Sequence, residues 1–83
     1  VLPTRRRRRM KRDILELLTL AEERVSAAEA CIHRQRDLIN TLRRLGYDTT
    51  DADALLVAFE KVQAQFIAYR DRLLDELEEI ATR

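Results

Sequence analysis

Glu29, Cys31 and His33 are the side chains whose types and spacing come nearest to a metal site. Glu29 and His33 stand four residues apart, so on a helix they would lie one turn apart on the same face. Di-iron carboxylate bundles need Glu-x-x-His pairs with further inward carboxylates, and structural zinc needs four ligands, whereas this chain holds one histidine and one cysteine. We therefore predict no metal and no other cofactor, and we interpret Glu29 and His33 as a surface salt bridge.

The groups available for covalent catalysis are few. Ser26 is the one serine, His33 the one histidine, and the sequence has neither a glycine-rich phosphate loop nor a nucleophile elbow. We predict that the protein is not an enzyme and has no catalytic residue. Cys31 has no second cysteine to pair with inside the chain, so we expect it to pack as a small apolar side chain in a reducing, cytoplasmic environment. An intermolecular disulfide across a two-fold axis is the alternative.

A basic arm at the N-terminus is the one segment with an obvious class of ligand. Residues 1–12 hold seven basic side chains and no acidic one, whereas residues 13–83 hold nine basic and fifteen acidic side chains. Such an arm would attract phosphate backbones in a salt-sensitive and largely sequence-independent way. The residues of this predicted nucleic-acid contact are Arg5, Arg6, Arg7, Arg8, Arg9, Lys11 and Arg12.

Three other interpretations of the arm compete with nucleic-acid binding. The arm would meet counter-charges at the acidic C-terminal end of the chain, or it would be a solvated, disordered extension. In the third interpretation, Met10 is the natural start of the protein, and residues 1–9 are upstream sequence that does not belong to it. No aromatic side chain stands among the arginines to stack on bases, so nucleic-acid binding ranks as the alternative function. The acidic residues concerned are Asp71, Asp75, Glu76, Glu78 and Glu79.

Two long helices are predicted to carry all these residues. Ala, Leu, Arg and Glu dominate the composition, while Gly and Pro occur once each. In the first helix, apolar residues recur at steps of four and three, the heptad spacing of packed helices, with one polar interruption. This seam is Ile14, Leu18, Ala21, Val25, Ala28, Ile32, Gln35, Ile39 and Leu42.

The second helix repeats the heptad spacing but contains one irregular step. The seam skips from Leu73 to Leu77, a stutter that would locally relax the supercoil. Ile67 and Leu74 stand off the main seam, so we expect the buried face to widen toward the C-terminus. The residues of this second seam are Leu55, Phe59, Val62, Phe66, Tyr69, Leu73, Leu77 and Ile80.

Between the helices, Gly46 is predicted to adopt the left-handed conformation that ends a helix, with Tyr47 available for the accompanying apolar contact. Thr50 is the predicted N-cap of the second helix, because acidic residues then occupy its first turn. We expect a basic arm over residues 1–12 and a hairpin over 13–83. Within it, the first helix covers about 10–45, the turn 46–50 and the second helix about 51–82.

The fold class predicted is all-α: an antiparallel, coiled-coil-like two-helix hairpin that forms a four-helix bundle as a homodimer. Apolar residues beside the first seam, such as Leu17 and Leu38, make the apolar stripe wider than one neighbouring helix can cover. A different, unidentified protein partner, a higher oligomer and a monomer are the alternatives. The predicted oligomer interface is Leu17, Leu18, Val25, Ile32, Leu38, Ile39, Leu45, Leu56, Phe59, Phe66 and Leu73.

Gln35 is the polar residue within the first seam, and two interpretations are open. A buried amide can fix the register or the oligomeric state of packed helices. The other interpretation is a partly exposed site near the middle of a loose helix pair.

Several short motifs resemble a group of short bacterial helical proteins of uncharacterised function. They are Arg34-Gln35-Arg36, the turn Gly46-Tyr47-Asp48-Thr49, and Arg70-Asp71-Arg72-Leu73-Leu74. The resemblance covers roughly residues 20–77 and implies the hairpin and the position of its turn. It implies nothing about mechanism.

Charged residues recur every few positions, so no apolar run approaches the roughly 20 residues that a membrane span needs. A membrane-surface role for the arm is weaker than nucleic-acid binding, because anionic lipid would repel the acidic body. We expect a protein without membrane association.

Overall fold

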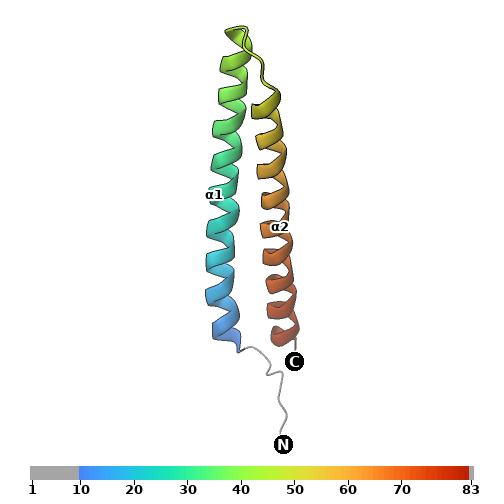
Figure 1. Cartoon of the computed structure of the whole chain (residues 1–83). Helices are drawn as coiled ribbons and strands as arrows, with labels where there is room; N and C mark the ends of the chain where they lie inside the picture. Colours follow the sequence, from blue (N-terminus) through green and yellow to red (C-terminus); the bar gives the residue numbers. More distant parts are fainter. Residues whose placement is uncertain (1–9, 83) are drawn as a thin grey trace, which may run out of the picture.

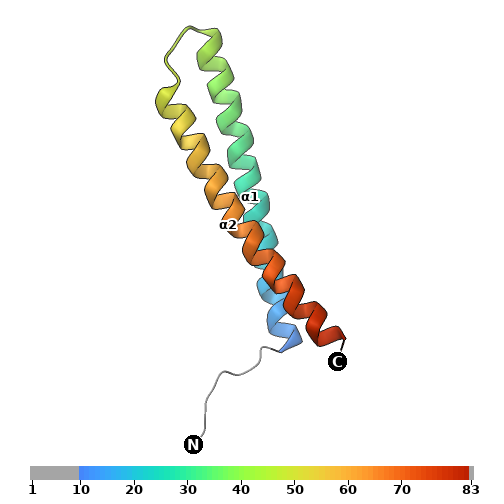
Figure 2. The same ribbon diagram turned by 90° about the vertical axis from the view of Figure 1, so that its right-hand side faces the viewer.

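The computed structural model describes residues 10–82, which form two long helices lying side by side (Figures 1 and 2). Helix α1 covers Lys11–Arg44 (34 residues) and α2 covers Thr50–Ala81 (32 residues). Each is about 50 Å long at 1.5 Å per residue. The Cα trace measures 65 × 25 × 16 Å, so the molecule is a single layer of two helices. The predicted all-α helical hairpin is confirmed.

A glycine-centred motif ends α1. Gly46 has φ of 82°, a left-handed conformation that carries little cost for glycine. The N–H of Gly46 donates to the carbonyl of Arg43 (3.0 Å), and the N–H of Tyr47 donates to that of Leu42 (2.9 Å). These two bonds make a Schellman motif and satisfy carbonyls that the helix end would otherwise leave free. The Tyr47 side chain stays 64% exposed, so backbone bonds rather than the expected apolar contact close this turn.

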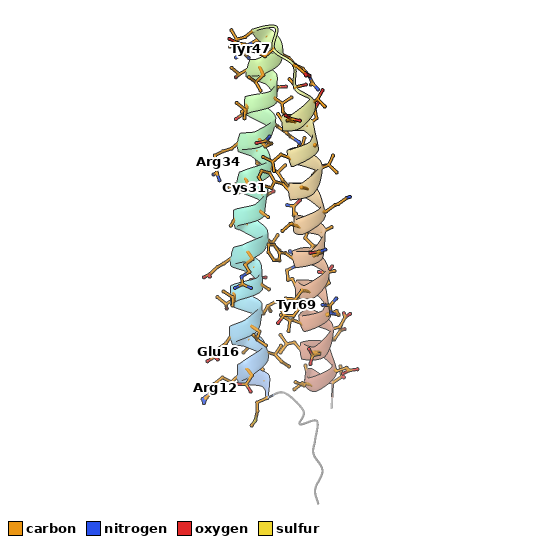
Figure 3. All side chains as sticks on the ribbon, in the orientation of Figure 1. Arg12, Glu16, Cys31, Arg34, Tyr47 and Tyr69 are labelled. Atoms are coloured by element: carbon orange, nitrogen blue, oxygen red, sulfur yellow. The ribbon has the colours of Figure 1, made fainter. Side chains whose placement is uncertain are left out.

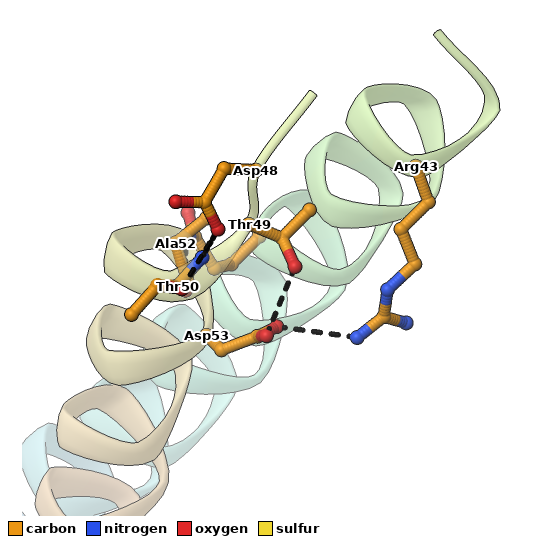
Figure 4. A network of polar contacts seen from close by, with 7 residues as sticks. Arg43, Asp48, Thr49, Thr50, Ala52 and Asp53 are labelled. Atoms are coloured by element: carbon orange, nitrogen blue, oxygen red, sulfur yellow. Dashed lines mark hydrogen bonds and ion pairs between the residues drawn. The ribbon is translucent and has the colours of Figure 1, made fainter. Parts of the chain in front are cut away.

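The start of α2 differs by one residue from the expectation that Thr50 is its N-cap. Thr50 is already helical and Thr49 is the N-cap, without a side-chain capping bond of its own. The carboxylate of Asp48 takes the capping role: its Oδ1 accepts from the hydroxyl (2.7 Å) and the backbone N–H (3.0 Å) of Thr50 (Figure 4). A charged acceptor makes stronger hydrogen bonds than a hydroxyl, which accounts for the shift.

The best-covered part of the core lies at the open end of the hairpin, where the chain enters α1 and leaves α2. Ile14 and Leu73 are fully buried there together with Ala21. Leu77 and Ile80 pack against this cluster, so the seam of α2 continues through the irregular step after Leu73. The partly buried residues that complete the cluster are Leu17, Leu18, Tyr69, Leu77 and Ile80.

Nearer the turn, the buried side chains of α1 are Ile32, Gln35 and Ile39. Figure 3 shows that Arg12, Glu16 and Arg34 of α1 are directed away from α2. The two helices therefore meet along the predicted seams. Within residues 10–82, neither helix contains a stretch long and apolar enough to cross a membrane.

Candidate protein-interaction surface

An apolar groove lies between the two helices near the middle of the hairpin. Its volume is about 360 Å³. Helix α1 contributes mostly small side chains to it, and α2 contributes larger ones, so the hollow lies over α1. The lining residues are Arg24, Ala27, Ala28, Cys31, Phe59, Val62 and Phe66. Arg24 is the one charged residue among them, and its aliphatic stem can line an apolar wall while its head stays in water.

The groove belongs to a longer apolar stripe, because residues seven positions apart lie on the same side of packed helices. Steps of seven from Cys31 lead to Leu38 and Leu45, and steps of seven from Val62 lead to Leu55 and Tyr69. We call this face the apolar side of the hairpin. Its residues are Leu17, Leu20, Ala27, Cys31, Leu38 and Leu45 from α1 and its C-cap, and Leu55, Phe59, Val62, Phe66 and Tyr69 from α2.

Much of the apolar side is open to solvent. Leu20, Leu38, Leu55 and Val62 are 42–47% exposed, and Leu45 is 65% exposed. Fully burying a side chain of this size contributes about 1.5–3 kcal/mol. Because these residues are already partly buried, a partner that covered them would gain a part of this free energy from each one. At the edge of this face the guanidinium of Arg72 lies 5.6 Å from the centre of the Tyr69 ring, within range of a cation–π contact.

The opposite face carries the ion pairs between the helices. Arg36 pairs with Glu60 (2.9 Å) and Arg43 with Asp53 (3.4 Å). A smaller hollow of about 170 Å³ lies here, lined by Arg36, Ile39, Asn40, Arg43, Asp53 and Leu56. We call this face the polar side. Exposed ion pairs of this kind contribute at most about 1 kcal/mol each, so they fix the register of the helices more than they stabilise them.

The eleven residues predicted as an oligomer interface fall into four places. Three of them are buried within the hairpin: α2 covers Ile32 and Ile39 of α1, and α1 covers Leu73 of α2. Little of their surface is left for a partner. The heptad pattern marks a residue as buried, but it cannot say whether the covering helix belongs to the same chain. The members that lie on the apolar side are Leu17, Leu38, Leu45, Phe59 and Phe66.

Of the remaining predicted interface residues, Leu18 and Val25 are half-buried between the helices, and Leu56 lines the hollow of the polar side. The interface prediction did not include Leu20, Ala27, Cys31, Leu55, Val62 and Tyr69, which also belong to the apolar side. The signal for them was present in the sequence, since each except Ala27 stands three, four or seven positions from an included residue on the same face, and Ala27 stands four positions before Cys31.

Gln35 is buried, with 7% of its surface exposed, and its side-chain Nε2 donates a 2.9 Å hydrogen bond to the carbonyl of Ala52 in the first turn of α2. The interpretation of Gln35 as a partly exposed residue is therefore wrong. The bond joins residues 17 positions apart in the two helices. It supports a role for Gln35 in fixing the register of α1 against α2 within one chain.

The residues nearest to a metal site do not converge. Cys31 is half-buried in the groove and its Sγ accepts a 3.3 Å hydrogen bond from Arg34 Nη2, whereas Glu29 and His33 are exposed. Among the residues that the structure describes, no ion pair joins Glu29 to His33, and no group of three or more metal-ligating side chains occurs. The expected salt bridge between Glu29 and His33 is thus not formed in this conformation.

The predicted nucleic-acid contact falls largely outside the described part of the chain. Five of its seven residues lie outside residues 10–82: Arg5, Arg6, Arg7, Arg8 and Arg9. Lys11 and Arg12 begin α1, and both are exposed. Of the acidic residues expected to meet the arm, Asp71 pairs with its neighbour Arg70 (3.2 Å).

Asp48, just before the start of α2, has a pKa that is shifted by its hydrogen bonds. The hydrogen bond from the Thr50 hydroxyl, and after it the bond from the Thr50 backbone N–H, hold the pKa of Asp48 below its usual value of 3.8. Both bonds favour the charged carboxylate at the positive end of α2. This arrangement stabilises the turn and has the features of a helix cap.

Comparisons of the chain with protein-family models, with curated proteins and with solved structures give no match. The resemblance to short bacterial helical proteins therefore stays an expectation.

Proposed function

We propose that this protein is a small structural interaction module that self-associates through its apolar side, as a homodimer with the architecture of a four-helix bundle. The observation that carries the proposal is the apolar groove between α1 and α2, which continues into exposed leucines toward both ends of the hairpin. Monomeric proteins rarely expose a continuous apolar surface of this extent, and such surfaces mark interaction sites.

The size of the apolar side fits a second copy of the chain. A face about 50 Å long and about 20 Å wide, the width of two helices, presents about 1,000 Å². A stable protein–protein interface needs about 800 Å² from each partner, so two hairpins that meet along their full length reach this size. A single peptide helix in the groove would cover only part of the face. Chains of this length also gain stability most readily by adding to their core through oligomerisation.

A pair of valine substitutions on opposite faces tests this proposal. Val62 lies in the groove of the apolar side and is 42% exposed. Val57 is 49% exposed and lies four residues after Asp53 and three before Glu60, which places it on the polar side. Both residues are therefore similar in type, exposure and helix, and they differ in the face that they occupy.

We expect light scattering of the full chain at micromolar concentration to give twice the chain mass of 9.8 kDa. Val62→Lys should give a monomer at the same concentration, because a charge would be buried in the interface without a partner. Val57→Lys should remain a dimer. A well-folded monomer for the unsubstituted chain, or dimers for both variants, would rule out self-association through the apolar side; circular dichroism confirms that each variant is helical.

A further inference from the structure

Resting on the proposed homodimer, we infer the orientation of the two copies: they associate in parallel, with both turns at the same end and with α2 of each copy placed over α1 of the other. The aromatic residues Phe59 and Phe66 of one copy then fill the hollow above Ala27, Ala28 and Cys31 of the second copy.

Two symmetric arrangements bring the apolar sides of two hairpins together. When the two-fold axis runs along the helices, the turns lie at the same end and α1 faces the partner's α2. When the axis runs across the helices, the turns lie at opposite ends, α1 faces the second α1 and α2 faces the second α2. A closed dimer has the same patch on both copies, so each arrangement repeats its contacts twice.

Side-chain size favours the parallel arrangement. The α1 wall of the groove carries Ala27, Ala28 and Cys31, and the α2 wall at the same level carries Phe59, Val62 and Phe66. In the parallel arrangement small residues face large ones on both sides of the axis, which fills the hollow as a well-packed core requires. In the antiparallel arrangement small residues would face small ones and aromatic residues would crowd together. Unfilled space and overpacking both reduce stability.

The net charge of the helix segments favours the same arrangement as a long-range effect. Near the turn, residues 34–44 of α1 hold four basic and one acidic side chain, and residues 50–60 of α2 hold three acidic and no basic ones. Among these side chains, Arg36, Arg43, Asp53 and Glu60 pair within the chain on the polar side and do not touch the second copy. Near the open end, residues 11–21 hold two basic and two acidic side chains, and residues 71–81 hold one basic and five acidic ones.

The ion pair between Arg43 and Asp53, and the core cluster that holds Ile14 and Leu73, place these segments at matching levels of the hairpin. In the parallel arrangement the basic segment 34–44 faces the acidic segment 50–60 of the second copy. In the antiparallel arrangement the acidic segments 50–60 and 71–81 of two α2 helices would face each other twice. Complementary charge selects orientation more than it raises affinity, so it acts here as a guide to the register of the two copies.

Distances between spin labels distinguish the two arrangements. The full chain carries Cys31→Ala, so that one label can be attached either at the turn through Tyr47→Cys or near the open end through Glu79→Cys; both side chains are exposed. In the parallel arrangement each pair of like labels is separated by the width of the bundle, and we expect distances below about 35 Å at both positions. In the antiparallel arrangement the pairs are separated by the length of the hairpin, above about 50 Å.

Short distances at both positions support the parallel arrangement. Long distances at either position overturn it while leaving the homodimer in place. A monomeric mass for the labelled chains and for the unlabelled chain, with no intermolecular distance, overturns the homodimer and the orientation together. Light scattering on each labelled sample separates these two results.

Discussion

Gln35 shows how one polar side chain can select a single alignment of two helices. Its amide is buried among apolar neighbours of the seam and donates to the carbonyl of Ala52. Sliding α1 against α2 by one turn would remove this bond and leave the amide buried without a partner. Leaving a buried polar group unsatisfied costs about 1–3 kcal/mol, so the bond disfavours other registers.

We expect Gln35→Ala to lower the free energy of unfolding by about 1–2 kcal/mol, since it removes the hydrogen bond and the packed side chain. Gln35→Met keeps the volume and removes the polar group, so its stability should stay within about 1 kcal/mol of the unsubstituted chain. Urea unfolding followed by circular dichroism measures both values. Equal stability for all three chains would show that Gln35 contributes neither packing nor a hydrogen bond.

Asp48 gives the turn a defined response to pH. Its pKa is lower in the folded chain than in the unfolded chain, because both hydrogen bonds from Thr50 favour the carboxylate. The stability that it contributes is therefore fully present above its usual value of 3.8 and is lost as the pH falls through the lower folded-state pKa. The unfolded chain binds the proton first, which sets this sign.

Asp48→Ala should accordingly destabilise the chain at neutral pH, and the difference from the unsubstituted chain should shrink as the pH falls below 3.8 and through the lower folded-state pKa. The measurement is the free energy of unfolding of both chains at each pH. Asp37→Ala serves as the control for the general loss of one negative charge, because Asp37 is exposed and lies well away from both ends of α1. A difference between the Asp48→Ala and unsubstituted chains that does not change with pH would contradict this account of the turn.

At the scale of the helices, the turn is defined by backbone conformation. Gly46 has no heavy atom within 4 Å of the position that a Cβ would occupy, so space does not limit the residue there. The backbone conformation limits the residue instead: at a φ of 82°, in the left-handed region, a Cβ atom would come too close to the residue's own backbone.

Gly46→Ala is expected to destabilise the chain by about 1–2 kcal/mol, and Gly46→Asn by less, since asparagine tolerates the left-handed region better. Thermal unfolding of the three chains at one protein concentration should rank them in the order Gly, Asn, Ala. Alanine equal to glycine would mean that the helix end relaxes to another conformation.

Most of each helix could be predicted from the sequence because the physical signals there are local. The heptad seam identifies Ile14, Ile32 and Ile39 as buried, and Gly46 marks the end of α1. The N-cap of α2 was predicted one residue too late, at Thr50 instead of Thr49, because Asp48, Thr49 and Thr50 all have suitable side chains. The outcome depends on the conformation of the turn, in which the Asp48 carboxylate reaches both the hydroxyl and the backbone N–H of Thr50, and the order of residue types does not contain that conformation.

At the scale of the whole molecule, the chain is a two-helix layer with one apolar and one polar side. The sequence showed that the apolar stripes are wider than one neighbour can cover, but it could not divide them between the inside of the hairpin and its outer face. That division depends on the rotation of each helix about its axis. The contacts from Arg36 to Glu60 and from Gln35 to Ala52 reveal this rotation, and both join residues far apart in the chain.

The midpoint of thermal unfolding should rise with chain concentration if the apolar sides of two copies meet. Mass action favours an assembly as concentration increases, and for two chains of this length a hundredfold increase corresponds to about 5–10 °C. Val62→Lys should remove this dependence, whereas Val57→Lys should keep it. Scanning calorimetry or circular dichroism over that range of concentrations measures it, and a constant midpoint for the unsubstituted chain would count against self-association.

The burial of Ile14 and Leu73 in one cluster has a consequence for how the hairpin opens. These residues are 59 positions apart, yet loop-closure entropy grows only with the logarithm of chain length, so their distance along the sequence costs little more than a shorter one. The ends of a hairpin are where fraying normally begins, and here they carry its most completely buried contact. Amide hydrogens at the start of α1 and the end of α2 should therefore exchange with solvent together with those near the middle of the hairpin, as one cooperative unit.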